Sequence, residues 1–332
     1  MFKRVLVTGG GGYKGHVLVP KLLKRGCEVV VYDLFLFGNY LQPHPKLTIA
    51  KSDLRDTAAY RQAVAGCDAV IHMGCISNDP SFELDSALSK SVNYDCFEPV
   101  VVASKEAGVR RFINVSSSSV YGVSDAPEVT EEHPLVPLTE YNKFKGLCEP
   151  LLWKHHAPGF VCVNIRPATV CGYSLRMRFD LTVNILTNHA VNKGVITVFG
   201  GAQKRPNIHI EDVTDLYSQL LDFPDGKIAG ETFNAGYENF TVAQLAEFAK
   251  KIVEEEFPAK APIQITTTPS DDNRSYHVSS RKIAEKLGWK PRRSIEDAVR
   301  DLCLAFKQNK FKDSMTNPEY FNVRTVKAIG LR

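Results

Sequence analysis

The sequence predicts an α/β protein in which a Rossmann-type, doubly wound parallel sheet is joined by a smaller, interleaved C-terminal α/β substrate domain. Short apolar segments without polar alternation recur through the first half of the chain, separated by helical patterns. Such segments are typical of parallel strands that are buried on both faces. The first of them ends in a glycine-rich turn that leads into a helix. The length of 332 residues is sufficient for two domains.

Each element is predicted from its local pattern. A buried strand is expected at residues 4–8, followed by a helix at 15–24 with one apolar face. Further strands are expected at residues 27–32, 47–50, 69–72, 112–115 and 160–164, with helices between them at 57–65, 88–106 and 141–155. The pattern then loosens, and we expect helices at 181–192, 243–256, 281–287 and 295–307, a strand at 263–268 and a docked tail at 311–332.

Composition excludes several classes of protein. The chain has 41 Lys+Arg against 37 Asp+Glu, and the basic residues are scattered among acids, so we expect no nucleic-acid partner. A helix that spans a bilayer needs roughly 18–20 consecutive apolar residues, and no segment of the sequence approaches that length. The eight cysteines form no CxxC pair, and the start lacks a secretory cleavage site, which together predict a cytoplasmic protein. His155, His156 and His189 lack metal-ligand spacing, so we expect no metal site.

The glycine-rich turn predicts a phosphate-binding loop. Gly10-x-Gly12-x-x-Gly15 fits the dinucleotide fingerprint, and Gly9-x-x-Gly12-x-x-Gly15 fits its close variant. Glycine permits the tight turn, the approach of the backbone to a pyrophosphate and the close packing of helix on strand. The N-terminus of the following helix then offers free N–H groups to the phosphates.

Acidic residues after the next two strands predict which dinucleotide binds. Asp33 lies 18 residues after Gly15, where a carboxylate accepts the ribose hydroxyls of NAD and repels a 2′-phosphate. Lys14 argues the other way, because a cation in the loop favours NADP. A turn aspartate is the simpler alternative for Asp33. Asp53 is either an adenine-side contact or a helix cap.

A reactive constellation is expected after the strand at 112–115. Four serines at 116–119 come directly after it, and Tyr141 and Lys145 are spaced to share one face of a helix. A phenol with a pKa near 10 is a poor base, but a neighbouring ammonium favours the phenolate. A serine hydroxyl at the end of a strand can hold the substrate oxygen whose proton moves. Alone, the Tyr-x-x-x-Lys pattern also fits an exposed helix face.

Taken together, these motifs resemble the extended short-chain dehydrogenase/reductase superfamily, in its NAD-dependent nucleotide-sugar epimerase/dehydratase branch, over about residues 3–300. The resemblance implies NAD as cofactor, a nucleotide-diphosphate sugar as substrate, and Ser117, Tyr141 and Lys145 as the catalytic set. It also implies a cofactor-binding set that comprises Gly9, Gly12, Tyr13, Lys14, Gly15, Asp33, Asp53, Leu54, Gly74 and Asn93, together with Tyr141 and Lys145.

The resemblance extends to the substrate side. Residues 166–172 match a family element, with Thr169 in place of the usual asparagine, and residues 200–212 match a second one. Substrate contacts are therefore expected from Ser117, Ser118, Thr169, Arg205 and Arg274, with the two arginines on the diphosphate. Either arginine fits a surface ion pair equally simply. Arg176 and Arg178 are atypical of the family and fit either a sugar contact or a solvated loop.

Among the reactions of the family, the residues of this chain favour one that starts with oxidation at a carbinol carbon. The family's dehydratases carry Asp-Glu where this chain has Ser118 and Ser119, and its deprotonating epimerases place a cysteine at the position of Ser119. Cys75 and Cys171 remain candidates for the neighbourhood of the site. Without an added acid or base, we predict C4 epimerisation through a transient 4-keto sugar. The alternatives are a keto-reductase or dehydrogenase using NAD(P)H, and a non-catalytic NAD-binding protein.

The motif map also predicts the domain organisation. Residues 1–172 form the NAD-binding domain, joined by about 206–240, and residues 173–205 and 241–332 form the substrate domain. Within the returning segment, the strand and helix of residues 207–221 are expected to rejoin the N-terminal sheet. The resemblance further implies a homodimer through the helices at 88–106 and 141–155.

Overall fold

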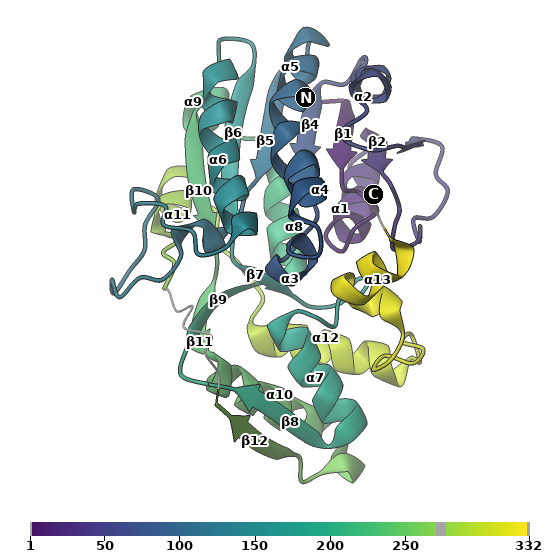
Figure 1. Cartoon of the computed structure of the whole chain (residues 1–332), viewed down its shortest axis with the longest axis vertical. Coiled ribbons are helices and arrows are strands. Elements are labelled where there is room, and N and C mark those ends of the chain that lie inside the picture. Colours follow the sequence, from purple (N-terminus) through teal and green to yellow (C-terminus); the bar gives the residue numbers. More distant parts are fainter. Residues whose placement is uncertain (1, 270–276, 331–332) are drawn as a thin grey trace.

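The computed structural model describes residues 2–269 and 277–330 and is built on a seven-stranded parallel sheet. This sheet forms a large lobe, with a small lobe at one end of it (Figure 1). The strands lie in the order β10 (Glu231–Ala235), β6 (Val161–Pro167), β5 (Arg111–Val115), β4 (Ala69–His72), β1 (Arg4–Thr8), β2 (Glu28–Asp33) and β3 (Leu47–Lys51). The predicted α/β fold with a doubly wound sheet is confirmed.

Helices cover both faces of the sheet because successive strand residues are apolar on both sides. Leu6 packs into the core that contains α2 (Thr57–Val64), α5 (Phe97–Glu106) and α6 (Glu140–His155). Val5 and Val7 pack into the opposite core, with α1 (Gly15–Lys24), α8 (Ile210–Gln219) and α11 (Arg281–Leu287). The short α9 (Asp225–Ile228) precedes β10.

The helix expected at 88–106 is interrupted. It consists of α4 (Ser86–Lys90), a π-helical turn η1 (Ser91–Asp95) and α5. The π turn carries the buried Asn93, whose side chain accepts a hydrogen bond from the Ile76 amide at 2.8 Å and donates one to its carbonyl at 2.9 Å. Such turns occur often at functional sites, and this one fixes the loop after β4.

One expected strand was placed wrongly. The strand at the start of residues 207–221 does not rejoin the large sheet: β9 (Lys204–His209) pairs with β7 (Thr169–Cys171) and β11 (Glu238–Thr241) in a separate three-stranded sheet. The helix of that segment, α8, does return and packs against α1. The strand that joins the sheet is β10, in parallel with β6. The exact domain boundaries stay a prediction.

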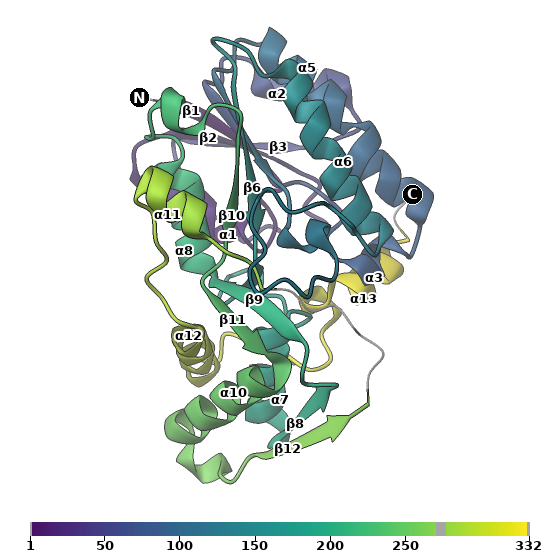
Figure 2. The same cartoon turned by 90° about the vertical axis from the view of Figure 1, so that its left-hand side faces the viewer.

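The small lobe has its own apolar core. Three helices, α7 (Thr182–Lys193), α10 (Val242–Glu256) and α12 (Ile295–Lys307), bury Leu186, Leu245 and Val299 among themselves. A two-stranded parallel ribbon of β8 (Val195–Phe199) and β12 (Gln264–Thr268) lies beside them (Figure 2). The short η3 (Pro258–Lys260) precedes β12 in the chain.

The C-terminal segment docks between the two lobes, as predicted for a tail, but it is also helical. It contains η4 (Pro318–Tyr320) and α13 (Asn322–Ile329), and α13 contacts α3 (Asp79–Phe82) of the large lobe (Figure 1). This places Asn322 at the start of a helix that faces the centre of the molecule.

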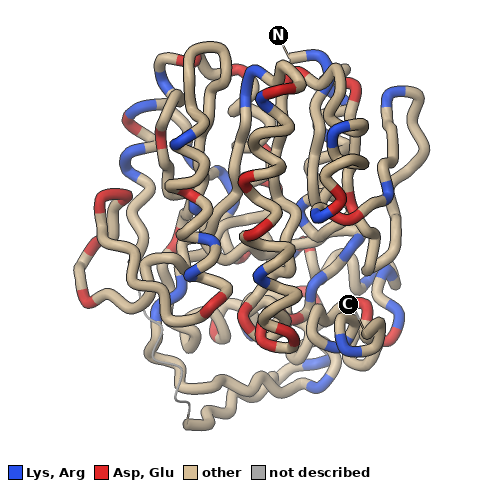
Figure 3. Tube along the Cα trace, turned by 45° about the horizontal axis from the view of Figure 1, so that its top comes forward, with Lys and Arg blue, Asp and Glu red and all other residues tan. Residues whose placement is uncertain are grey.

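Charge is distributed over the chain without a large field of one sign. Lys and Arg are interspersed with Asp and Glu over the trace (Figure 3). Within the described residues, no helix is long and apolar enough to cross a membrane. The same residues contain no group of three or more His, Cys, Asp or Glu side chains placed to hold a metal ion.

Candidate active site

A cavity of about 550 Å³ lies at the carboxyl ends of the parallel strands. The loops after β1, β2, β3, β4, β5 and β6 all contribute to its wall, and β7, β9 and α13 complete it. This edge of a doubly wound sheet is where such folds bind ligands. Of the predicted site residues, the cavity is lined by Gly9, Gly12, Tyr13, Lys14, Asp33, Asp53, Leu54, Gly74, Ser117, Ser118, Tyr141, Lys145, Thr169 and Arg205.

Two of the predicted residues that the structure describes do not line the cavity. Gly15 lies behind the loop at the start of α1, and Asn93 is engaged with the Ile76 backbone, so Asn93 shapes the wall and is not part of its surface. Arg274 lies outside the described residues. Its expected contact with a diphosphate stays a prediction.

The glycine loop is shaped as a cradle. A Cβ at Gly9 would lie 2.8 Å from the Cα of Gly74, and one at Gly15 would lie 2.2 Å from the carbonyl oxygen of Gly10. Gly9 also has φ of +70°, which favours glycine. Lys14 precedes α1 without a side-chain capping hydrogen bond. The amides of His16 and Val17 donate to the carbonyls of Gly12 and Lys14. What the start of α1 offers a phosphate is therefore chiefly the positive end of the helix dipole and the close approach of the glycine backbone. The loop fits a dinucleotide.

Asp33 lies beside this loop at the end of β2. Its carboxylate accepts hydrogen bonds from the backbone amides of Gly11 at 2.9 Å and Phe35 at 2.6 Å. Burial raises the pKa of Asp33, while these two amides oppose that rise. The side chain is thus fixed at the cavity wall with remaining lone pairs for ribose hydroxyls.

Asp53 is an ion-paired residue of the cavity wall. Its carboxylate lines the cavity and is paired with Arg55, with 2.7 Å between Oδ2 and Nη2. The cap of α2 is Asp56, which accepts from the Ala59 amide at 2.9 Å. The helix-cap interpretation of Asp53 is therefore wrong.

Tyr141 and Lys145 occupy adjacent turns of α6, which Thr139 caps. Lys145 is buried, and its Nζ donates to the carbonyl oxygen of Val115 at 3.1 Å. Burial raises the pKa of Tyr141 well above its usual range, and Cys75 and Asp79 raise it further, while the charge of Arg178 lowers it. Arg178 is therefore a cation that favours the phenolate, in addition to the one expected at Lys145, whose effect on Tyr141 stays a prediction.

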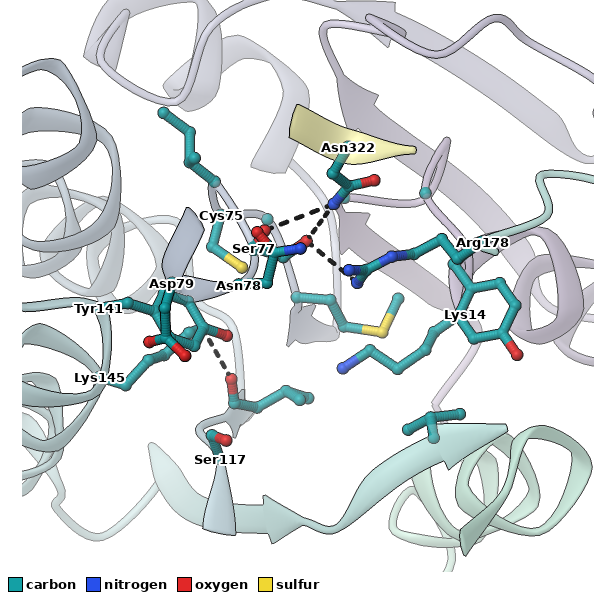
Figure 4. A pocket seen from close by; sticks show the side chains of 18 of the residues that line it. Lys14, Cys75, Ser77, Asn78, Asp79, Ser117, Tyr141, Lys145, Arg178 and Asn322 are labelled. Carbon is teal, nitrogen blue, oxygen red and sulfur yellow. Dashed lines mark hydrogen bonds between the residues drawn. The ribbon is translucent and has the colours of Figure 1, made fainter. Parts of the chain in front are cut away.

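The serines after β5 line the same end of the cavity (Figure 4). The Oγ atoms of Ser117 and Ser119 lie 2.7 Å apart, and the Ser119 hydroxyl donates to the side-chain oxygen of Asn142 on α6. Ser118 is buried and begins the short η2 (Ser118–Tyr121). Ser117 thus lies where its hydroxyl can bond a substrate oxygen near Tyr141.

A second wall was not predicted from the sequence. Arg178 is buried and pairs with Asp180, with 2.9 Å between Nε and Oδ1, and its Nη1 donates to the Ser77 hydroxyl at 3.3 Å. The amide of Asn322 donates to that same hydroxyl at 2.8 Å. In Figure 4 these side chains lie across the cavity from Tyr141. The solvated-loop interpretation of Arg178 is wrong; the only sequence signal was the Arg-x-Arg-x-Asp spacing.

One further acid–base group was missed from the sequence. Asp79, the first residue of α3, lines the cavity beside Tyr141, together with Cys75 in the loop after β4, which was a candidate for the neighbourhood of the site. The expectation that the site adds no acid or base to its catalytic set is therefore corrected. Asp79 accepts a hydrogen bond from Thr139, the residue that caps α6. Cys171 is fully buried and does not line the cavity.

Comparison with known proteins gives the same picture. A family model described as the NAD dependent epimerase/dehydratase family matches residues 5–236. A UDP-glucose 4-epimerase of Lactobacillus helveticus is 27% identical over 326 residues, covering 92% of this chain and 97% of its own. UDP-glucuronic acid decarboxylase 2 of Arabidopsis thaliana is 26% identical over 324 residues, covering 93% and 69%.

A solved relative shares the fold. The dTDP-glucose 4,6-dehydratase DesIV of Streptomyces venezuelae, with NAD bound, superposes with a TM-score of 0.81 at 22% identity, covering 92% of this chain and 98% of that one. Since the family model spans more than half of the chain, the protein is an enzyme of the NAD dependent epimerase/dehydratase family, and its cofactor is NAD.

Proposed function

We propose that the protein epimerises nucleotide-diphosphate hexoses at C4 through a transient 4-keto sugar. The observation that supports this most is one cavity that contains Ser117, Tyr141 and Lys145 together with the cofactor loop. When bound, NAD would supply reversible hydride transfer with the sugar carbon. The relatives named for UDP-sugars and dTDP-sugars support this class of substrate.

Each residue of the site has a separate task. Tyr141, as the phenolate, accepts the proton of the sugar hydroxyl and later returns it. Ser117 hydrogen-bonds the same oxygen and fixes its direction. Lys145, anchored on the Val115 carbonyl, holds a positive charge beside the base. Arg205, at the cavity edge on β9, binds the diphosphate, because a guanidinium offers two parallel donors to phosphate oxygens.

The two residues after the catalytic serine favour epimerisation over dehydration. Ser118 is buried and Ser119 is bonded to Ser117 and Asn142. Neither hydroxyl is a carboxylic acid that could expel water from the sugar. Asp79, a carboxylate whose charge acts on Tyr141, accepts a hydrogen bond from Thr139, the cap of α6, and we assign it the task of positioning the start of this helix.

The test is turnover of UDP-, GDP-, CDP- and dTDP-hexoses followed by NMR, without added cofactor. The proposal expects an equilibrium mixture of two C4 epimers and no net change in NADH absorbance. Stoichiometric consumption of NAD(P)H would instead assign the alternative, a keto-sugar reductase or dehydrogenase. Loss of carbon dioxide from a nucleotide hexuronate would assign a decarboxylase. Tyr141→Phe, run in parallel, identifies any turnover that does not use this site.

The enzyme is further proposed to act as a cytoplasmic homodimer. The helices α5 and α6 pack side by side on one face of the sheet, and Leu147 on α6 is exposed. A second copy that covers these helices would form a four-helix interface. Light scattering on the wild type and on Leu147→Glu tests this: dimer and monomer, respectively, are expected.

A further inference from the structure

Lys14 brings a positive charge to the reactive end of the cavity. It is the residue between the glycine turn and α1, and its side chain lines the cavity. The groups whose charges act on it are Cys75 in the loop after β4, Lys145 on α6 and Arg178 in the loop after β7. Its Nζ lies 5.7 Å from the ring centre of Tyr217 on α8. In Figure 4 Lys14 and Arg178 extend toward the space that Tyr141 and Cys75 face.

This position separates Lys14 from the end of the cavity that would hold the adenosine of NAD. Asp33, which marks that end, is influenced by Arg176 and not by Lys14. The charges that act on Lys14 thus differ from the one that acts on Asp33, which favours a place for Lys14 at the reactive end over a contact with a 2′-phosphate. The ammonium group is placed to act on the reaction.

Among the residues that the structure describes, none of the ion pairs within 4 Å includes Lys14, and the neighbouring cations have partners of their own. Arg178 is paired with Asp180, and Lys145 donates to the Val115 carbonyl. Burial lowers the pKa of Lys14 to about 8, and the charges of Lys145 and Arg178 act in the same direction.

A cation here distinguishes the two forms of the cofactor. The oxidised nicotinamide ring carries a positive charge and the reduced ring carries none. For the reaction to occur, the ring must lie close to the sugar carbon whose hydroxyl Tyr141 deprotonates. An ammonium group lining the same end therefore repels the oxidised form more than the reduced form.

We propose that Lys14 biases the bound cofactor toward its reduced form and so favours the oxidation half of the reaction. In that half the carbinol C–H bond breaks, its hydrogen and two electrons pass to the nicotinamide ring, and the hydroxyl proton passes to Tyr141. The keto sugar formed with it is thereby held longer in the cavity. The inference needs NAD binding only, and it holds whether the full reaction is epimerisation or net reduction.

The backbone at Lys14 permits a clean substitution. Its φ of −71° and ψ of −33° suit any residue, and its side chain makes no capping bond. Lys14→Met removes the charge at similar length, and Lys14→Arg keeps the charge. The quantity to measure is the ratio of the Kd for NAD⁺ to the Kd for NADH, by calorimetry on cofactor-free protein without sugar.

The ratio is expected to fall about tenfold in Lys14→Met, on the basis of one unit charge at short range in a partly desolvated site, and to stay near the wild-type value in Lys14→Arg. An unchanged ratio in Lys14→Met would overturn the proposal. So would an equal fall in both variants, since the charge would then not be the cause. Because no sugar is present, these outcomes are independent of whether C4 epimerisation is observed.

A pH series on the wild type provides a second test without any variant. As pH rises from 7 to 9.5, Lys14 loses its proton around its pKa of about 8, the repulsion disappears, and the ratio should fall toward that of Lys14→Met. The other charged and titratable groups of the site (Cys75, Asp79, Tyr141, Lys145 and Arg178) remain in Lys14→Met. The part of the wild-type slope that the variant lacks therefore reports Lys14. A flat wild-type profile, or the same slope in Lys14→Met, contradicts the proposal.

Discussion

The side-chain amide of Asn322 donates a hydrogen bond of 2.8 Å to the hydroxyl of Ser77, which lies 245 residues earlier in the chain. Its side-chain oxygen accepts from Nη2 of Arg176 at 2.5 Å, and its backbone amide donates to Asp180 at 3.2 Å. The start of α13 therefore joins the loop after β4 to the loop after β7. Both loops line the cavity, so the C-terminal segment determines the shape of the active site.

Removing this junction should impair binding more than chemistry. In Asn322→Ala we expect the KM for the nucleotide sugar to rise about tenfold with a smaller change in kcat, because Tyr141 is untouched. Stability should fall by about 1–3 kcal/mol, as expected for buried polar partners that are left unsatisfied. Lys327→Ala, exposed on the same helix, is the control and should match the wild type. Equal kinetics for both variants would show that α13 does not shape the site.

The close packing of the glycine loop gives a test that is independent of the reaction. A Cβ at Gly15 would lie 2.2 Å from the Gly10 carbonyl, whereas one at Gly226 would meet nothing within 4 Å. Gly15→Ala should therefore cost about 1–3 kcal/mol in the free energy of unfolding and weaken NAD binding. Gly226→Ala should do neither. Urea denaturation and calorimetry check both, and similar NAD affinity in the two variants would contradict the loop's assigned task.

Breaking the buried ion pair of Arg166 and Glu149 should lower the free energy of unfolding more than breaking an exposed ion pair. Nη2 of Arg166 and Oε2 of Glu149 are 2.6 Å apart, with both side chains almost fully buried, and Glu149 also accepts from Ser116. Removing one partner leaves a buried charge, so Glu149→Ala should lose about 3–5 kcal/mol in urea denaturation. Lys251→Ala breaks an exposed pair with Glu296 and should lose less than about 1 kcal/mol. Comparable losses would contradict this ranking.

The pH profile should report the charges around Tyr141. Because its pKa is raised and the phenolate is the reactive form, kcat/KM should increase with pH. Arg178 lowers the pKa of Tyr141 and Asp79 raises it. The rising limb should therefore move to higher pH in Arg178→Met and to lower pH in Asp79→Asn. Shifts in the same direction, or a limb that does not move, would exclude Tyr141 as the group observed.

The features that the sequence could predict depended on local spacing. The turn from β1 to α1 needs its glycines within eight residues, and the Tyr141–Lys145 pair needs only one helical turn, so both patterns were visible without the fold. Asp33 was predictable because β2 comes directly after α1.

The remaining features depended on contacts between distant segments. β9 pairs with β7 and β11 and not with the large sheet, and nothing in its composition distinguishes these edges. Asp79 reaches Tyr141 because α3, which follows β4 in the chain, packs against α6, and Asn322 lies in a segment without periodicity. Arg178 was recognised as a cation in an atypical place, but its burial and its pairing with Asp180 needed the folded chain.

The central claim is that the hydrogen at C4 leaves and returns within one active site. The most direct measurement uses a nucleotide hexose that carries deuterium at C4 of the sugar, incubated with the enzyme in ordinary water and monitored by NMR and mass spectrometry. C4 epimerisation predicts that both C4 epimers keep the deuterium at C4 and that Tyr141→Phe forms no second epimer. Loss of the label to water, or its appearance in released NADH, would contradict C4 epimerisation.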